Sequence, residues 1–379
     1  MGMIRRARQV KRTVKIVLVG GSVMAAGAAA VAAVGAGVAG AMLLRKLRPS
    51  AEVRGKVVLI TGGSRGLGLA IAQEFAAAGA KVAICARDQG ELDAAREQMR
   101  GSGPEVLALQ CDVSNNEDVL QMVRQVTSLR GEVDFLVNNA GVMSVGPLES
   151  QSFSDYQEAM DVMFWGMLYP TLAVLPQMIA RGSGHIANVT SIAGKVAVPH
   201  LLPYTAAKFA AVGFSEGLHA EVAQYGVRVT TVVPGLMRTG SFLNAYFKGQ
   251  NEAEFGWFSL ASSAPLLAMN GRRAARKIVA AARRGQAEIV LTPQAKLLAW
   301  MNGLFPGVTS EMISLAARLM PRAANNDGRR FRGTESESAL SRSVLTHFGR
   351  EAARELNESP ENGAYGRGTA LPSEAPEPA

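Results

Sequence analysis

Short apolar runs alternate with longer amphipathic segments through the middle of the chain. Five of these runs are rich in Val, Leu, Ile and Ala, and they cover residues 57–61, 81–86, 105–110, 133–137 and 185–189. Apolar runs of this length predict strands that are buried on both faces. The longer segments between them predict crossover helices that join parallel strands. The pattern therefore predicts an α/β fold: one doubly wound parallel sheet with helices on both faces.

The first 48 residues have a different pattern. Residues 16–44 carry no charge, and basic residues flank them on both sides. As a helix rising ~1.5 Å per residue, this stretch would exceed the ~30 Å hydrocarbon core of a bilayer. Its Ala, Gly and Val composition makes it only a marginal span. We predict that residues 1–48 are an uncleaved membrane segment, with a cleaved secretory signal and a flexible linker as alternatives.

The positive charge of the chain supports the same prediction of a membrane segment. The net charge is +9, and a basic balance is typical of proteins that bind nucleic acid or an anionic membrane. The positive residues cluster at the two ends of the apolar stretch, so we predict a membrane partner and no nucleic acid. Cys85 and Cys111 end two of the apolar runs and show no metal-ligand spacing, which predicts reduced core cysteines and no metal site.

A glycine-rich turn follows the first apolar run. The sequence Gly62-Gly63-Ser64-Arg65-Gly66-Leu67-Gly68 lies between a predicted strand and a predicted helix. Backbone N–H groups at such a helix N-terminus bind phosphate, and the missing side chains let it approach. The spacing is G-x-x-x-G-x-G, which differs from the standard G-x-G-x-x-G dinucleotide fingerprint.

The second strand predicts which dinucleotide binds. It ends at Ala86, where an acidic residue would otherwise meet the ribose 2′-hydroxyl, and Arg87 follows. An arginine at this place, together with Arg65 in the glycine loop, can pair with a 2′-phosphate. We therefore predict NADP(H) over NAD(H). The alternative is that Arg87 is a solvated residue at the start of a helix.

Polar residues also end the next two strands. Asp112 follows the third strand, where it would meet the adenine, and the sequence Asn138-Asn139-Ala140-Gly141 follows the fourth. Amides and a glycine at the carboxyl ends of parallel strands are suited to a ligand crevice.

The catalytic candidates are Ser191, Tyr204 and Lys208. The tyrosine and the lysine are four residues apart, so on a helix they share one face. The lysine ammonium is expected to lower the tyrosine pKa toward neutral pH, so that the phenol can give or take a proton at a carbonyl or alcohol oxygen. Ser191 ends the strand at 185–189, where its hydroxyl can hold the same oxygen.

Taken together, these motifs resemble the short-chain dehydrogenase/reductase family over roughly residues 54–292. The resemblance is carried by Thr61–Gly68, Asp112, Asn138–Gly141, Ser191, Tyr204, Lys208, Pro234-Gly235 and Thr239. It implies one Rossmann-type domain with about seven parallel strands, and hydride transfer between a nicotinamide and a carbonyl/alcohol pair. It further implies that Tyr204 is the acid/base, that Lys208 holds the nicotinamide ribose and tunes Tyr204, and that Ser191 orients the substrate.

The motifs and the resemblance together predict a set of cofactor-binding residues. The set is Thr61, Gly62, Ser64, Arg65, Gly66, Leu67, Gly68, Arg87, Asp112, Val113, Asn139, Ala140, Gly141, Tyr204, Lys208, Pro234, Gly235 and Thr239. One position departs from the family pattern. Met163 stands where the family usually has an asparagine that anchors a proton-relay water, and a thioether is only a weak acceptor.

The C-terminal third carries the substrate-side predictions. Within residues 240–264, an aromatic set is expected to line an apolar pocket, with an ordinary lid core as the alternative: Phe242, Tyr246, Phe247, Trp257 and Phe258. Residues 293–322 form short apolar segments that suit interfacial helices or a substrate cover. Residues 325–379 are polar and are predicted to be disordered.

The sequence thus predicts a membrane-associated, NADP(H)-dependent oxidoreductase that interconverts a ketone and a secondary alcohol on a lipophilic substrate, as a homodimer or homotetramer. The alternative is a catalytically weak, cofactor-binding regulatory or scaffold protein at a membrane, for which Met163 is the only support. Basic residues are denser before the apolar stretch than after it, which by the positive-inside tendency would export the catalytic domain. A need for reduced NADP and the two free cysteines favour a cytoplasmic catalytic domain instead, and we adopt that prediction.

Overall fold

A computed structural model describes residues 37, 40, 50–323, 328–338 and 346–359 of the 379-residue chain. The chain divides into two compact units, Met1–Pro49 and Ser50–Ala379. The predicted membrane segment, apart from two single residues, lies outside the described part. The following description concerns the second unit.

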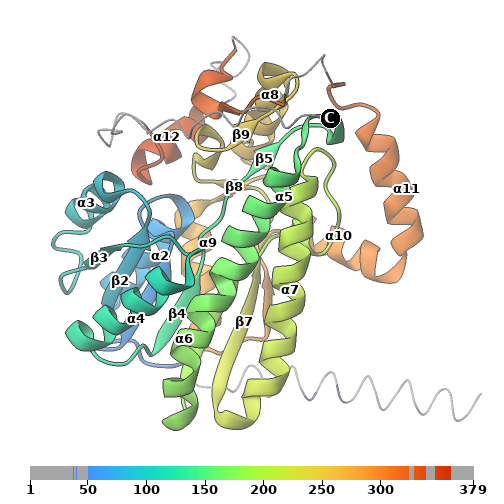
Figure 1. Ribbon diagram of the computed structural model, residues 1–379. Coiled ribbons are helices and arrows are strands. Elements are labelled where there is room, and N and C mark those ends of the chain that lie inside the picture. The colour runs from blue at the N-terminus through green and yellow to red at the C-terminus, as the bar shows by residue number, and fades with distance from the viewer. Residues whose placement is uncertain (1–36, 38–39, 41–49, 324–327, 339–345, 360–379) are drawn as a thin grey trace, which may run out of the picture. The chain divides into compact units, whose positions relative to one another are not determined.

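A seven-stranded parallel sheet forms the centre of this unit, in the order β11-β7-β6-β4-β1-β2-β3 (Figure 1). Its strands are β1 (Val57–Thr61), β2 (Lys81–Ala86), β3 (Leu107–Gln110), β4 (Phe135–Asn138), β6 (Gly184–Val189), β7 (Val227–Val233) and β11 (Glu288–Val290). The predicted doubly wound α/β fold is confirmed. The strand order reverses between β1 and β4, and ligands bind at such a reversal, beyond the carboxyl ends of the strands.

Helices cover both faces of the sheet because successive residues of each strand point to opposite sides. Val58 and Ile60 of β1 face one core, and Val57 and Leu59 face the other. The first core is covered by α2 (Gly66–Ala77), α3 (Gln89–Gln98) and α9 (Gly271–Arg283). The second is covered by α4 (Asn116–Arg130), α6 (Gly166–Ala180) and α7 (Leu202–Val222).

The longest apolar helix runs from Phe153 to Ala180 and joins α5 (Phe153–Met160), the π-helical turn η2 (Asp161–Trp165) and α6. Within the described residues it is the one helix long and apolar enough to cross a membrane. However, 44% of its most apolar stretch is buried, and Met163 and Val174 pack in the second core. Core helices of soluble domains have the same length and composition, so this helix is only weak evidence of membrane association.

Smaller elements lie beyond the carboxyl ends of the strands. β5 (Ser144–Val145), β9 (Tyr246–Phe247) and β12 (Phe331–Arg332) form a three-stranded sheet, and β8 (Met237–Arg238) pairs with β10 (Met269–Asn270). The short turns are η1 (Leu148–Ser150), η3 (Ile192–Gly194), η4 (Ala223–Tyr225), η5 (Ser241–Leu243) and η6 (Gly333–Glu335). The remaining helices are α8 (Asn251–Ser263), α10 (Pro293–Leu304), α11 (Pro306–Ala317) and α12 (His347–Glu355).

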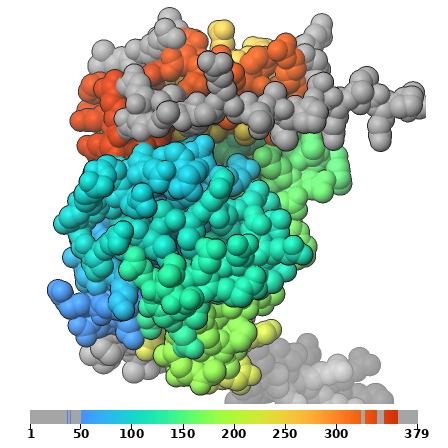
Figure 2. Space-filling view, turned by 60° about the vertical axis from the view of Figure 1, so that its left-hand side comes forward, coloured from blue at the N-terminus to red at the C-terminus, as the bar shows by residue number. Residues whose placement is uncertain are grey.

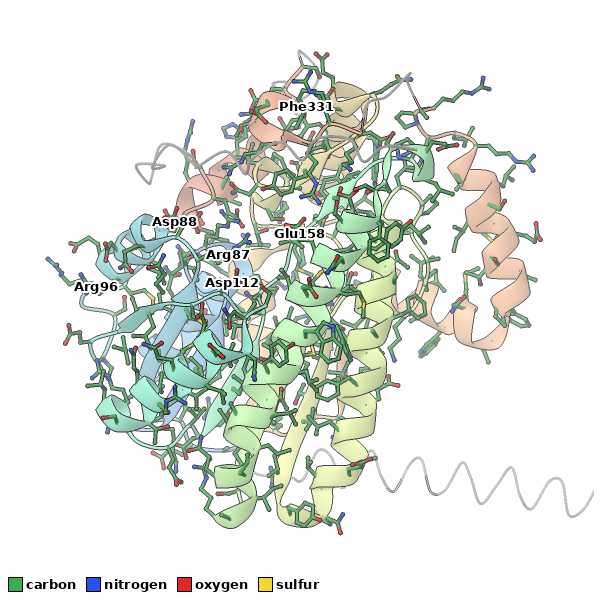
Figure 3. The ribbon with its side chains drawn as sticks, viewed as in Figure 1. Arg87, Asp88, Arg96, Asp112, Glu158 and Phe331 are labelled. Atoms are coloured by element: carbon green, nitrogen blue, oxygen red, sulfur yellow. The ribbon has the colours of Figure 1, made fainter. Side chains whose placement is uncertain are left out.

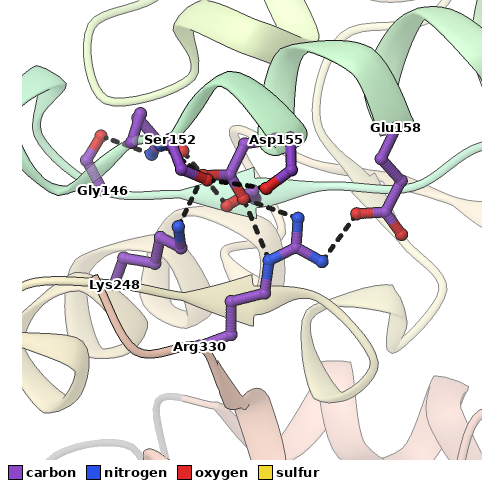
Figure 4. A network of polar contacts seen from close by, with 9 residues as sticks. Gly146, Ser152, Asp155, Glu158, Lys248 and Arg330 are labelled. Carbon is purple, nitrogen blue, oxygen red and sulfur yellow. Dashed lines mark hydrogen bonds and ion pairs between the residues drawn. The ribbon is translucent and has the colours of Figure 1, made fainter. Parts of the chain in front are cut away.

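The prediction of a disordered tail over residues 325–379 is wrong for residues 328–338 and 346–359, which we call the C-terminal strap. β12 pairs antiparallel with β9, and Arg330 forms ion pairs with Asp155 and Glu158 (Figure 4). The buried Lys248 binds the same Asp155 carboxylate. These partners lie far away in the sequence, so the polar composition of the tail gave no sign of them. The rest of the predicted tail lies outside the described residues.

Candidate active site

The glycine loop and the end of β4 are joined across the strand-order reversal. The Thr61 hydroxyl accepts hydrogen bonds from the backbone N–H groups of Asn139 (3.0 Å) and Ala140 (3.2 Å). The Asn139 amide Nδ2 donates to the carbonyl oxygen of Gly62 at 3.0 Å. A Cβ atom on Gly68 would collide with that same carbonyl, so the turn requires glycine there. The motif residues predicted at both strand ends therefore meet in one place.

This loop fits the phosphates of a dinucleotide. Helix α2 begins at Gly66, directly after the loop, and Gly66 has a φ of +57°, which favours glycine. Its N-terminus has no side-chain cap, so the first backbone N–H groups depend on other partners. A helix N-terminus without a side-chain cap, preceded by glycines, is the arrangement that binds pyrophosphate.

The two arginines predicted to select NADP(H) lie in different surroundings. Arg65 pairs with Glu91 (Nη1 to Oε1, 2.6 Å) and lies 3.5 Å from Glu358 (Nε to Oε2). Arg87 is exposed after β2, and Figure 3 shows it with Asp112 at the same end of the sheet. Sequence reasoning missed both glutamates that contact Arg65. The sequence did indicate the position of Glu91 at a helix start. It follows Asp88 by three residues, and Asp88 caps α3 by accepting from the Glu91 N–H.

Asp112 has its carboxylate fixed by the next turn. Its Oδ1 accepts from the Ser114 backbone N–H at 2.9 Å and from the Ser114 hydroxyl at 2.7 Å. Val113 is buried beside Gly166, where a Cβ would crowd it. Gly141 lies near Met163, whose sulfur is 3.8 Å from where a glycine Cβ would be. These predicted residues thus lie at the carboxyl ends of β3 and β4.

Ser191, Tyr204 and Lys208 are brought together at the end of β6. Ser191 follows the strand and hydrogen-bonds the Tyr204 phenol, and its hydroxyl also accepts from the Ala193 N–H at 3.1 Å. Lys208 Nζ donates to the Val189 carbonyl at 3.0 Å and lies 5.7 Å from the centroid of the Tyr204 ring. One helix, α7, carries the tyrosine and the lysine, as their spacing predicted.

The electrostatics differ from the sequence-based expectation. Burial raises the pKa of Tyr204 above its usual value, and the hydrogen bond with Ser191 opposes this only in part. Burial lowers the pKa of Lys208 to about 8. The shift of the Tyr204 pKa is therefore upward, opposite to the expected lowering, because desolvation outweighs the hydrogen bond with Ser191. The phenol is protonated at neutral pH, which suits a proton donor.

A chain of buried polar groups holds α7 against the sheet. Asn138 Nδ2 donates to Asn188 Oδ1 at 2.9 Å, and Asn188 Nδ2 donates to the Ser215 hydroxyl at 3.0 Å. Ser215 in turn lies 2.7 Å from the Thr231 hydroxyl. The chain joins β4, β6, α7 and β7, so it fixes the helix that carries Tyr204 and Lys208. Of its members, the sequence motifs had singled out only Asn138.

Met163 is buried in the π-helical turn η2. A π-helical turn inserts an extra residue into a helix and is frequent at functional sites. The side chain packs with the apolar residues of the second core, where its thioether replaces an amide with a group that hydrogen-bonds only weakly. The departure from the family pattern is therefore a change from a polar to an apolar contact beside the site.

Residues 240–264, which we call the lid, carry aromatic side chains that divide into two groups. Phe242, Phe247 and Phe258 are buried in a separate small core around Phe255, so for them the lid-core alternative is the correct interpretation. Tyr246 and Trp257 are half-buried. Tyr204 itself packs against this small core, which makes its surroundings apolar.

A partly buried polar contact between His200 and Glu254 holds the lid, and the sequence motifs did not indicate it. His200 Nδ1 lies 2.6 Å from Glu254 Oε1, and the Trp257 indole donates to the other oxygen of that carboxylate at 2.7 Å. His200 has a φ of +62°, in the left-handed region that non-glycine residues rarely adopt. The pair joins α8 to the segment just before α7, the helix that carries Tyr204 and Lys208.

Comparisons with known proteins agree with this geometry. The short chain dehydrogenase family model matches residues 56–246. A dehydrogenase/reductase SDR family protein 7-like protein of Anopheles gambiae is 34% identical over 272 residues, which are 70% of this chain and 84% of that protein. The putative oxidoreductase SadH of Mycobacterium tuberculosis is 37% identical over 248 residues, covering 64% of this chain and 88% of the relative.

Two solved structures are also similar. A short-chain dehydrogenase from Streptomyces avermitilis has a TM-score of 0.59 at 30% identity, covering 70% of this chain and 97% of its own. A gluconate 5-dehydrogenase from Burkholderia cenocepacia in complex with NADP and tartrate has a TM-score of 0.56 at 26% identity, covering 65% and 97%. This chain therefore belongs to the short-chain dehydrogenase/reductase family, whose members are oxidoreductases that use a nicotinamide cofactor.

Proposed function

We propose that this oxidoreductase is NADP(H)-dependent and interconverts a ketone and a secondary alcohol on a lipophilic substrate. The observation that carries the proposal is the grouping of Ser191, Tyr204 and Lys208 at the same end of the sheet as the glycine loop. When bound, the nicotinamide supplies or accepts the hydride. The protein supplies the proton and the position of the substrate oxygen.

In the reducing direction, the Tyr204 phenol donates its proton to the substrate oxygen. Its raised pKa keeps that proton in place at neutral pH. The Ser191 hydroxyl holds the same oxygen, and the Lys208 ammonium is positioned by the Val189 carbonyl. The positive charge of that ammonium stabilises the phenolate that remains after proton transfer. In the oxidising direction the same groups act in reverse.

The preference for NADP(H) is supported by the charges around the adenosine end. Arg65 and Arg87 are cations, and Ala86 stands where an acid would favour NAD(H). The Burkholderia cenocepacia relative was solved with NADP. Arg65 can serve a 2′-phosphate only if it leaves or shares its two carboxylate partners, which makes Arg87 the less encumbered of the two arginines.

A lipophilic substrate and a membrane partner are supported by apolar surface. Tyr204 packs against the small aromatic core of the lid. Helices α10 and α11, with Phe305 between them, expose a run of large apolar side chains: Leu297, Leu298, Trp300, Leu304, Phe305, Val308, Met312 and Leu315. Such a helical pair suits a lipid interface, where the enzyme would take its substrate. We propose that the catalytic domain is cytoplasmic at this membrane, and that the protein assembles as a homodimer or homotetramer.

The deciding experiment measures NADPH consumption by the purified protein against a panel of steroid-like, retinoid-like and long-chain ketones, with polar keto acids such as 5-ketogluconate as the contrasting set. We expect turnover with apolar ketones. The alternative function, a catalytically weak cofactor-binding protein, is favoured by Met163 alone. It would be supported by tight NADPH binding together with no turnover on any member of the panel.

A further inference from the structure

The end of the C-terminal strap lies on the glycine loop. The Gly66 backbone N–H, at the start of α2, donates to the Leu356 carbonyl at 2.7 Å. Asn357 Nδ2 donates to the carbonyl oxygen of Ser64 at 3.0 Å and to that of Glu91 at 3.2 Å. One of the N–H groups that a phosphate would use is therefore already engaged by residues almost 300 positions further along the chain.

Glu358 places a carboxylate at the same spot. It is 4% exposed, and a Cβ on Gly66 would collide with its Oε1. Asn244 Nδ2 donates to its Oε2 at 2.6 Å and to its backbone carbonyl at 3.0 Å. Arg65 Nε lies 3.5 Å from Oε2. The carboxylate thus has an amide donor, a guanidinium and a helix N-terminus around it, which is the environment that binds a phosphate.

Helix α12 fixes this end of the strap. Ala353 lies so close to Gly240 that a Cβ there would collide with it, and Leu356 fills the space beside Gly271. Asn357 has a φ of +57°, a left-handed conformation that turns the chain down onto the loop. In Figure 2 the red and orange residues of the C-terminal region lie directly against the blue and cyan nucleotide half. The contact is therefore packed as well as hydrogen-bonded.

We propose that Leu356, Asn357 and Glu358 form a built-in plug that competes with the dinucleotide for the pyrophosphate site. This rests on the proposed function, because it assumes that the dinucleotide binds at the glycine loop. A carboxylate and a diphosphate repel each other at this distance, so the two occupants exclude one another. Binding of the cofactor expels Glu358 and at the same time releases one partner of Arg65 for the 2′-phosphate.

The strap could instead close over a bound cofactor as a clamp, and the chemistry of Glu358 argues against this. A clamp over a diphosphate would offer cations or N–H donors, whereas this residue offers an anion. Burial raises the pKa of Glu358, and Arg65 and Asn244 oppose that shift. The site therefore tolerates the carboxylate by supplying it with donors, and those donors serve a phosphate equally well.

The test measures the dissociation constant of NADPH by fluorescence titration of the full chain. Glu358→Gln keeps the size of the side chain and removes its charge, and Glu358→Ala removes the group from the loop. We expect both variants to bind NADPH more tightly by roughly tenfold, within the 5–150-fold range typical of coupled sites. Glu351→Gln, an exposed change on α12 within the same strap, is the matched control and should leave the dissociation constant unchanged.

Hydrogen exchange of the unaltered protein gives a second measurement. We expect NADPH to speed amide exchange in residues 346–359 and to slow it in the glycine loop. Slower exchange in residues 346–359, or variants that bind NADPH no more tightly than the unaltered protein, would overturn the plug while leaving the proposed function intact. If neither the unaltered protein nor the variants bind NADPH or NADH, the proposed function is wrong, and the plug fails with it.

Discussion

The two halves of the candidate site are built in different ways. In the half that contains Tyr204, the polar chain that holds α7 comes from adjacent elements of the central domain: β4, β6, α7 and β7. Around Gly66, the loop is covered by Leu356 and Glu358 from the far end of the chain. The first half is fixed by the fold of the domain, and the second depends on where a terminal segment lies.

This difference separates two kinds of control. A site held by a buried hydrogen-bond network keeps its geometry whether or not a ligand is present, because each broken bond would leave an unpaired polar group. A site covered by a short segment can exchange that segment for a ligand at a modest cost. Under the proposed function, the catalytic groups are therefore preorganised, and cofactor entry is the step that the proposed plug would regulate.

The largest expected effect lies in the preorganised half. Tyr204→Phe keeps the ring in its apolar surroundings and removes the proton. We expect kcat for ketone reduction to fall by roughly 10²–10⁴-fold, the usual contribution of general acid–base catalysis. NADPH binding should be retained, since the phenol contributes little to holding the dinucleotide. Steady-state kinetics and NADPH titration of the same preparation measure the two quantities.

Tyr225→Phe is the matched control, because this tyrosine is 46% exposed in η4 and lies away from the crevice. It should show unchanged kcat. Near-normal turnover of Tyr204→Phe would show that another group carries the proton, and the contrast between the two halves would lose its catalytic side.

What the sequence predicted follows the same division. The parallel α/β sheet, the glycine loop and the Tyr204–Lys208 pair came from local patterns: apolar runs, a turn, and a four-residue spacing. The number of strands, about seven, came from the resemblance to the family. The position of Glu358 could not be predicted, because its contacts with Gly66, Arg65 and Asn244 join segments more than 100 residues apart. The raised pKa of Tyr204 was missed for a related reason, since burial is a property of the packed lid.

The adenosine end can be tested by reversing its charges. Replacing Ala86 by Asp and Arg87 by Gln supplies an acceptor for the ribose 2′-hydroxyl and removes one partner of the 2′-phosphate. We expect the ratio of kcat/KM for NADPH to that for NADH to fall by roughly 10–100-fold, because a hydrogen bond to a charged group is worth about 1.5–3 kcal/mol. The measurement compares both cofactors with one ketone.

The single variant Arg87→Gln, compared with the double variant, shows how much of the preference for NADPH comes from the arginine. If the unaltered protein used NADPH and NADH with equal efficiency, the assignment of Arg65 and Arg87 to a 2′-phosphate would be wrong. If Arg87→Gln left the preference for NADPH unchanged, the preference would come from Arg65. The choice of cofactor would then depend on the glycine loop that Leu356 and Glu358 cover.

The pH dependence of kcat/KM tests whether catalysis needs the positive charge of Lys208. Its folded pKa is about 8, lowered by burial, so the ammonium is present below that pH and is lost above it. We expect kcat/KM for ketone reduction to be level below pH 8 and to fall above it, approaching about tenfold per pH unit. Tyr204 adds no limb in this range, because its pKa is raised. A profile that stays level to pH 10 would show that the lysine charge is not needed.

The smallest effect concerns the exposed helices α10 and α11, which share neither kind of control. Leu304 is 71% exposed on α10, and Leu129 is 63% exposed at the end of α4. In a chain that begins at residue 49, we expect release of most of the protein from membranes, with activity retained and weak binding left to anionic vesicles. Leu304→Ser should weaken that remaining binding by roughly threefold to tenfold, because about 1 kcal/mol of apolar burial in lipid is lost. Leu129→Ser should not, since it removes similar surface elsewhere. Equal loss from both variants would mean that α10 has no special contact with lipid, and vesicle co-sedimentation measures the difference.

With the full chain in sealed cells, protease added outside should leave the catalytic domain intact, and digestion there would overturn its cytoplasmic placement.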